Sequence, residues 1–141
     1  MSGLQVPPNC DLTLGLLRLD TSGPAAGWQM TADERFANPA GILQGGFVAA
    51  LCDSAMGASA VTAAIEGGRK ISCANAEMKV SFLHRVATGS VLTCTPRVLS
   101  GGARLVFCEA DVHDGEGRLV AKASSTYVIT PRGPGRTDDG C

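Results

Sequence analysis

The chain has 141 residues, enough for one domain with its own core, and its formal net charge at pH 7 is -1. This charge gives no electrostatic basis for binding nucleic acid. The few aromatic residues (four Phe, one Trp and one Tyr) also argue against a surface on which bases stack, so we expect no nucleic-acid partner.

The first ten residues predict a flexible N-terminal arm, because Pro7 and Pro8 oppose regular structure. Residues 1–10 also lack the basic and apolar regions of a secretory signal. None of the six cysteines forms a C-x-x-C pair or a Cys/His cluster with zinc-finger spacing, so we expect no metal site. These features favour a cytoplasmic protein with reduced thiols.

The first regular element is expected within Asp11–Asp20, where leucines occupy every second position from Leu12 to Leu16. This alternation is typical of a half-buried strand. Residues 21–27 are rich in turn formers and separate this strand from Trp28–Phe36, where we expect a second short strand or the frayed end of one.

The central stretch, Gly46–Ile65, is apolar or small on every side, and Asp53 is its only charge. A helix without a polar face is buried all round, in a protein core or in a membrane. The stretch is long enough to cross a bilayer, but it consists mostly of Ala, Gly, Ser and Thr. A mid-span Asp also costs about 2.5–3.5 kcal/mol, so we expect a core helix that ends near Gly67 and Gly68, and no membrane association.

A lone carboxylate on such a helix has two interpretations. Asp53 can be a partly exposed structural residue that is hydrogen-bonded to backbone or to a serine. Alternatively it can be a catalytic base or nucleophile, a role for which a carboxylate in a perturbed environment is suited. The helix alone does not separate these interpretations.

Four strand-like segments follow the helix, and turn signals separate them. In the first of them the residues on one face are expected to be apolar, while Asn75 and Glu77 lie on a solvated face. Asp114 and Gly115 give the signal of a hairpin turn. The four segments are Ile71–Leu83, Ser90–Leu99, Ala103–Val112 and Arg118–Thr130; the apolar face of the first carries Ala74, Ala76, Met78, Val80 and Phe82, and its other face also carries Lys79 and Ser81.

These elements predict an α+β fold in which one antiparallel sheet wraps around a single long helix. We expect one domain over residues 11–130 and a disordered tail over 131–141, which is rich in Pro, Gly and charge. At the expected start of the helix, Gly45 and Gly46 let backbone N–H groups approach a ligand closely. Such a turn suits an oxyanion formed during acyl transfer, although it can also be a plain glycine-rich cap.

The segment reads Asn38-x-x-Gly41-x-x-Gln44-Gly45-Gly46, followed by Asp53 and Gly57. This pattern resembles the hotdog-fold acyl-CoA thioesterases, in the branch of phenylacetate-pathway and 4-hydroxybenzoyl-CoA thioesterases. Those proteins read roughly N-x-x-G-x-x-H-G-G-x(6)-D/E-x(3)-G. The likeness extends from about residue 10 to 130 and includes residues 81–85 and 114–129, which read SFLHR and DGEGRLVAKASSTYVI.

The resemblance implies that Asp53 acts as general base or nucleophile at the thioester carbonyl. It further implies that the Gly45 amide, with Gly46, polarises the thioester oxygen and that Asn38 positions substrate or water. Gln44 stands where many relatives have His, and a Gln side chain forms hydrogen bonds but does not titrate. The remaining position of the pattern is Gly57, where some relatives carry a hydroxyl.

Helix geometry adds an expectation about assembly. Eight helical residues rise about 12 Å, so Asp53 lies too far from Gly45 of its own chain for both to act on one carbonyl. We therefore predict an obligate homodimer with two symmetric composite sites, and a homotetramer as the full assembly.

The resemblance therefore implies hydrolysis of an aromatic or medium-chain acyl-CoA to the free acid and coenzyme A, without a cofactor. Two alternatives remain. A non-catalytic acyl-CoA-binding protein is favoured by the missing His at position 44 but not by the retained Asp53. An enoyl-CoA hydratase or dehydratase would need a His beside the acidic residue, and the motif has none.

Overall fold

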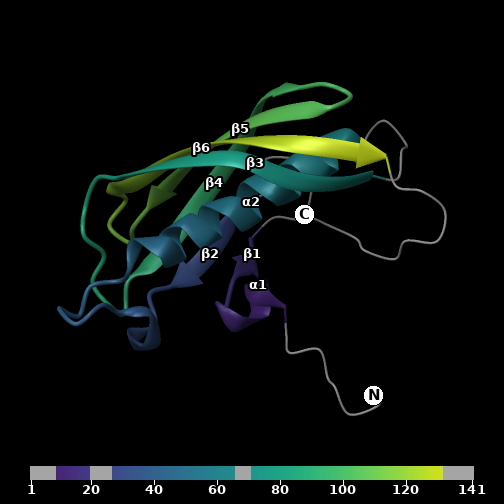
Figure 1. The fold of residues 1–141 in the computed structure, drawn as a ribbon. Helices are drawn as coiled ribbons and strands as arrows, with labels where there is room; N and C mark the ends of the chain where they lie inside the picture. Colours follow the sequence, from purple (N-terminus) through teal and green to yellow (C-terminus); the bar gives the residue numbers. More distant parts are fainter. Residues whose placement is uncertain (1–8, 20–26, 66–70, 132–141) are drawn as a thin grey trace, which may run out of the picture.

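The computed structural model describes residues 9–19, 27–65 and 71–131, which form one curved sheet packed on one long helix (Figure 1). The sheet is antiparallel throughout, and its strands lie in the order β1-β2-β4-β5-β6-β3. The expected α+β arrangement, a sheet around a single helix, is confirmed. The elements are α1 (Cys10–Thr13), β1 (Leu17–Arg18), β2 (Trp28–Thr31), the 3-10 helix η1 (Glu34–Phe36), α2 (Gly45–Ile65), β3 (Ile71–Phe82), β4 (Val91–Gly101), β5 (Leu105–His113) and β6 (Leu119–Pro131).

Helix α2 forms the centre of the core by packing one side on the concave face of the sheet. Strands β4, β5 and β6 supply the opposing apolar layer, because buried residues alternate with less buried ones along β5, most of β6 and the first half of β4. The opposite side of α2, which includes Phe47, Ala50, Ser54 and Ala58, is only half-buried. The prediction that this helix is buried all round is therefore wrong for the single chain.

By length and hydropathy alone, Gly45–Ala64 could span a membrane. The same helix has Leu51, Cys52, Ala55 and Met56 fully buried against the sheet. Its packing is that of a core helix, in agreement with the interpretation drawn from its small residues and its Asp.

The N-terminal segment differs from the expected strand. Residues Cys10–Thr13 form a helical turn, because the Asn9 side-chain oxygen accepts a hydrogen bond from the Leu12 amide at 3.2 Å and caps it. The strand is reduced to Leu17–Arg18, which pairs with β2. The prediction of a strand over the whole of Asp11–Asp20 is therefore wrong. The alternation of leucines does not reveal that Asn9 caps a helical turn at this place.

Strand β3 carries a bulge that changes which residues face the helix. In its register with β6, Asn75 pairs with Tyr127 and Glu77 with Thr126, so Ala76 is the extra residue. The expected apolar face is therefore correct only after the bulge, at Met78 and Val80, which pack against the core. Before the bulge the faces are exchanged: Ala74 and Ala76 are exposed, and Asn75 turns toward α2, where it hydrogen-bonds to Asp53.

The other strands after the helix and the hairpin agree with the prediction. In the segment Trp28–Phe36 only Trp28–Thr31 is a strand, because the Asp33 side chain caps a 3-10 helix over Glu34–Phe36. The turn between β5 and β6 is closed by the Asp114 amide donating to the Arg118 carbonyl at 3.0 Å, and Gly117 takes a φ of 82°, which glycine adopts without strain. The helix end predicted near residues 67 and 68 lies outside the described residues. The same holds for residues 1–8 of the arm expected over 1–10 and for residues 132–141 of the tail expected over 131–141.

The thiols follow the prediction only in part. Cys10, Cys52, Cys94 and Cys108 are free, and all but Cys10 are buried in the core. Cys73 on β3 is disulfide-bonded, so the expectation of reduced thiols is wrong at this position.

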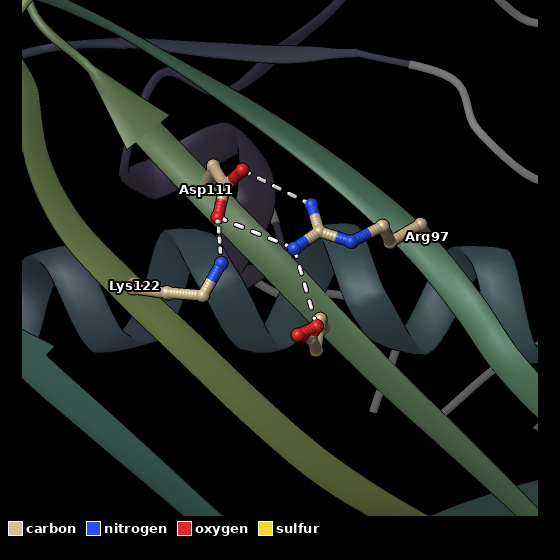
Figure 2. Close-up of polar contacts among 4 residues, drawn as sticks. Arg97, Asp111 and Lys122 are labelled. Carbon is tan, nitrogen blue, oxygen red and sulfur yellow. Dashed lines mark hydrogen bonds and ion pairs between the residues drawn. The ribbon is translucent and has the colours of Figure 1, made fainter.

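The outer face of the sheet holds a cluster of charges across β4, β5 and β6 (Figure 2). Arg97 contacts Asp111 at 3.1 Å and Glu109 at 3.2 Å, and Lys122 contacts Asp111 at 2.8 Å. The hydrogen bond from Lys122, together with Arg97, lowers the pKa of the Asp111 carboxyl. These charges satisfy one another on the face opposite α2, so they are a structural ion-pair network rather than part of a site around the helix.

The packing predicts that two leucines contribute very differently to the free energy of unfolding. Leu51 on α2 has no exposed surface, whereas Leu99 on β4 is 57% exposed. Leu51→Ala is expected to lower the free energy of unfolding by about 2–5 kcal/mol, because it leaves a cavity in the core. Leu99→Ala is the matched control and should change it by about 0.5 kcal/mol or less. Denaturant unfolding measures both, and similar losses for the two variants would contradict the described packing.

Candidate active site

The Asp53 carboxylate lies on the side of α2 that packs beside β3 and β6, and it is half-buried. One of its oxygens, Oδ1, accepts two hydrogen bonds, from Asn75 Nδ2 at 2.8 Å and from the Tyr127 hydroxyl at 2.7 Å. Among the described residues no donor bonds to Oδ2. The carboxylate is thus anchored through one oxygen, while the other can accept a proton or attack a carbon.

The Asn75 amide is itself held in place from the strand below it. The Ser125 hydroxyl lies 2.9 Å from Asn75 Oδ1 and 3.0 Å from the Glu77 carbonyl oxygen. Because the amide oxygen accepts from Ser125, the amide nitrogen is turned toward Asp53. The bulge at Ala76 is what brings Asn75 to this face of the strand.

Tyr127 is completely buried under the helix. Burial, and next its hydrogen bond to Asp53, raises the pKa of the Tyr127 phenol above its usual range. The hydroxyl therefore stays protonated and acts as a hydrogen-bond donor to the carboxylate at every pH at which an acyl-transfer enzyme works.

The start of α2 presents backbone donors at Gly45 and Gly46. In the described part of the chain neither amide donates to a backbone carbonyl, as expected for the first turn of a helix. A Cβ at Gly45 would lie 2.9 Å from Phe82 Cζ, whereas one at Gly46 would meet nothing within 4 Å. Glycine at position 45 thus lets the end of β3 approach the first turn of the helix closely, and the amides can stabilise negative charge on an oxygen.

A cavity of about 500 Å³ lies beside Gly45, between the start of α2 and the end of β3. Its lining is mainly apolar, and its charged or titratable members are His84 and Arg85, both of which are exposed. A cavity of this size and character suits an apolar group of modest size. The remaining lining residues are Ile42, Leu43, Gly45, Val48, Phe82, Leu83, Val86, Val120 and Ala121.

Asn38 lies in the loop before the helix, and its side chain stabilises that loop. Its Oδ1 accepts from the Ala40 amide at 2.9 Å and from the Ile42 amide at 3.1 Å. This Asx-type turn uses the carbonyl oxygen and leaves the side-chain amide nitrogen for other partners. Gln44 directly precedes the helix and is exposed, and Gly57 is buried on α2 one turn beyond Asp53.

The structure does not bring Asp53 and Gly45 together within one chain. Both lie on the uninterrupted helix α2, and eight residues of α-helix rise about 12 Å. Asp53 is also absent from the lining of the cavity beside Gly45. The Asp53 carboxylate and the Gly45 amide, which are expected to act on one carbonyl, therefore lie at two separate places in each protomer and form the two halves of a site.

Sequence reasoning missed Tyr127, Asn75 and Phe82 as members of the site. Tyr127 carried a signal, because a buried phenol needs a hydrogen-bond partner and Asp53 is the only charge on the central helix. Asn75 carried none, since strict alternation puts it on the solvated face. The contact of Phe82 with Gly45 depends on how β3 crosses the helix start, which no local pattern encodes.

The comparisons with known proteins agree on one family. Residues 40–121 match the family model of the thioesterase superfamily. A candidate esterase of Saccharolobus solfataricus is 36% identical over 97 residues, which are 69% of this chain and 61% of that protein. The chain thus spans somewhat less than two thirds of the curated relative's length.

Two solved structures show the same hotdog fold. The Escherichia coli PaaI protein, from the phenylacetic acid degradation operon, superposes with a TM-score of 0.79 at 18% identity and covers 88% of this chain and 86% of its own. A candidate thioesterase of Ralstonia eutropha, related to phenylacetic acid degradation, gives a TM-score of 0.73 at 27% identity over 90% of this chain and 94% of its own. The predicted fold class is confirmed.

The loop before α2 generates a prediction for Asn38. Asn38→Ala removes the acceptor of two backbone amides and should lower the free energy of unfolding by about 0.5–1.5 kcal/mol, because these hydrogen bonds are exposed and water can replace the lost acceptor. Asn38→Asp keeps an oxygen at the same place and should be closer to the wild type. Denaturant unfolding of both variants checks this, and equal losses would mean that the Oδ1 contacts contribute little.

Proposed function

The chain belongs to the thioesterase superfamily, and we propose that it hydrolyses the thioester bond of an acyl-CoA with water, giving a free acid and coenzyme A. The observation that supports this most strongly is the Asp53 carboxylate, whose Oδ1 is anchored by two donors while Oδ2 is left without one among the described residues. A structural carboxylate has no need for one unengaged oxygen, whereas a base or nucleophile does.

Two routes use this oxygen. As a general base, Asp53 takes a proton from water while the water oxygen bonds to the thioester carbon; the C–S bond then breaks, and the proton passes to the thiolate of coenzyme A. As a nucleophile, Asp53 Oδ2 attacks the carbon and expels the thiolate, and water then hydrolyses the resulting anhydride. Both routes give the same products, and neither needs a metal or a cofactor.

The oxyanion that forms in either route needs donors. We assign this role to the Gly45 amide, assisted by Gly46, because both lie at the positive end of α2 and are not engaged by backbone carbonyls in the described residues. Gln44 directly precedes Gly45, and Asn38 lies in the loop before the helix; in this proposal both position the substrate or the attacking water through their side-chain amides. Gly57, on the turn of α2 that follows Asp53, contributes to the substrate site through its small size.

The two halves of the site meet only if two protomers combine. We propose an obligate homodimer in which Asp53 of one protomer and Gly45 of the other act on the same carbonyl, so that a two-fold axis creates two equal sites. Strand β3 supports this, because it is a twelve-residue strand at the edge of the sheet and its outer side has no partner among the described residues. The half-buried side of α2 offers a second surface for the partner, and a homotetramer is the expected full assembly.

The substrate class follows from the cavity beside Gly45. Its apolar lining and volume of about 500 Å³ suit an aromatic or medium-chain acyl group. The phenylacetic acid named for two structural relatives supports the aromatic choice. Exposed Arg85 at this cavity can meet a coenzyme A phosphate.

A second candidate function is non-catalytic binding of acyl-CoA, favoured by Gln44, which cannot titrate as His does. A hydratase or dehydratase is less favoured, because His84 and His113, the two histidines of the chain, lie outside the motif. For each of these functions we propose that the protein acts in the cytoplasm on a soluble substrate, without a nucleic-acid or membrane partner.

The proposed function predicts release of coenzyme A from at least one member of a panel of aryl- and alkanoyl-CoAs. Asp53→Asn should lower kcat by about 100-fold or more, the order expected when an acid–base group is lost. Chromatography is the suitable readout, because the protein's own thiols react with thiol dyes. Asn at position 53 keeps the size of the side chain and an oxygen for Asn75 and Tyr127.

A wild type that binds acyl-CoA but releases no coenzyme A from any member of the panel would support the binding function instead. Equal turnover by wild type and Asp53→Asn would show that Asp53 is not the reacting carboxylate. Hydration of an enoyl-CoA by the wild type would favour the hydratase.

A further inference from the structure

The hydroxyl of Tyr127 is a buried polar group for which the proposed reaction has no direct use. We propose that Tyr127 is a positioning residue that orients the Asp53 carboxylate, holding Oδ1 so that Oδ2 is the oxygen that reacts. This inference rests on the proposed function and extends it to a residue that never touches the substrate.

The geometry places the Tyr127 hydroxyl against two parts of the same residue. It lies 2.7 Å from Asp53 Oδ1 and 3.0 Å from the Asp53 carbonyl oxygen. Because the phenol carries one proton, it donates to the nearer of the two oxygens, Asp53 Oδ1, and rotation of the carboxylate about its side-chain bonds breaks this hydrogen bond. Tyr127 is on β6, which lies between β5 and β3 in the sheet, and it is fully buried, so its own position is fixed by packing.

Asn75 completes the restraint from the neighbouring strand. Its Nδ2 lies 2.8 Å from the same oxygen, so both lone-pair positions of Oδ1 are occupied by donors. A water molecule or a thioester carbon that approaches Asp53 is thereby directed to Oδ2. Ser125 in turn fixes the Asn75 amide, which extends the network from β6 through β3 to α2.

The hydroxyl itself is what needs an explanation, because a phenylalanine would fill the same space. The residue has no exposed surface, and a buried hydroxyl without a partner destabilises a protein. Asp53 Oδ1 accepts from the hydroxyl at 2.7 Å and so satisfies it, and burial keeps the phenol protonated as a donor. The contact therefore joins Tyr127, which has no exposed surface, to Asp53, the one charged residue of α2.

Tyr127→Phe tests the role by removing only the oxygen. We expect kcat to fall about tenfold, as for loss of one hydrogen bond to a charged group, while KM stays within about twofold because the substrate is not touched. In an Asp53→Asn background the same change should have no further effect on the residual rate. Ile129→Val is the matched control: it shortens a buried residue two positions along the same strand and should leave kcat unchanged.

Some kinetic outcomes would overturn the proposal. If Tyr127→Phe lowers kcat by the same factor in the wild type and in the Asp53→Asn background, or does not lower it at all, the hydroxyl does not act through the carboxylate. A fall in kcat that Ile129→Val reproduces would point to a general loosening of β6.

A second measurement tests the contact between Tyr127 and Asp53 without an activity assay. The chain has one tyrosine, so ¹³C labelling at the tyrosine Cζ gives a single NMR resonance that reports on the hydrogen bond of the hydroxyl. Asp53→Ala should displace this resonance, and Ile129→Val should displace it less. If the wild type hydrolyses no thioester but the resonance moves as expected, the proposed function fails and the contact stands; an unmoved resonance in Asp53→Ala overturns the inference itself.

Discussion

A charged group on an otherwise apolar helix must find its hydrogen-bond donors on whatever the helix packs against, and the rest of the site follows from this constraint. For Asp53 the donors come from two neighbouring strands, Asn75 on β3 and Tyr127 on β6. The bulge at Ala76 is needed because a regular strand would turn Asn75 to the outer face. Since both donors bind the same oxygen, the network that stabilises the charge in the fold also leaves one oxygen for chemistry.

A second constraint is distance along the helix. Asp53 and Gly45 are parts of one rigid rod, and a rise of about 12 Å separates the carboxylate from the helix amides. No side-chain movement within one chain removes that separation. The partner that we propose would cover three features that the described residues leave uncovered: the edge of β3, the half-buried side of α2 and Phe82, which is 55% exposed.

The sequence predicted the long helix, the four strands after it and the position of Asp53, because small-residue composition, alternation and turn residues are local signals. It did not predict the helical turn at Cys10–Thr13, which depends on a cap by Asn9, or the exchange of faces in β3. The partners of Asp53 were also hidden. Asn75 is 22 residues and Tyr127 is 74 residues away in the chain, so only the register between strands could place them beside the helix.

The central claim, that each site combines Asp53 of one protomer with Gly45 of the other, is tested most directly by mixing two inactive variants. Asp53→Asn and Gly45→Val each damage both sites of a homodimer, the second because a Cβ at position 45 would lie 2.9 Å from Phe82 Cζ. After unfolding and refolding together in equal amounts, half of the dimers carry both chains, and one site in each is intact. The account predicts recovery of about a quarter of wild-type activity. Activity no higher than that of the separate variants would contradict it.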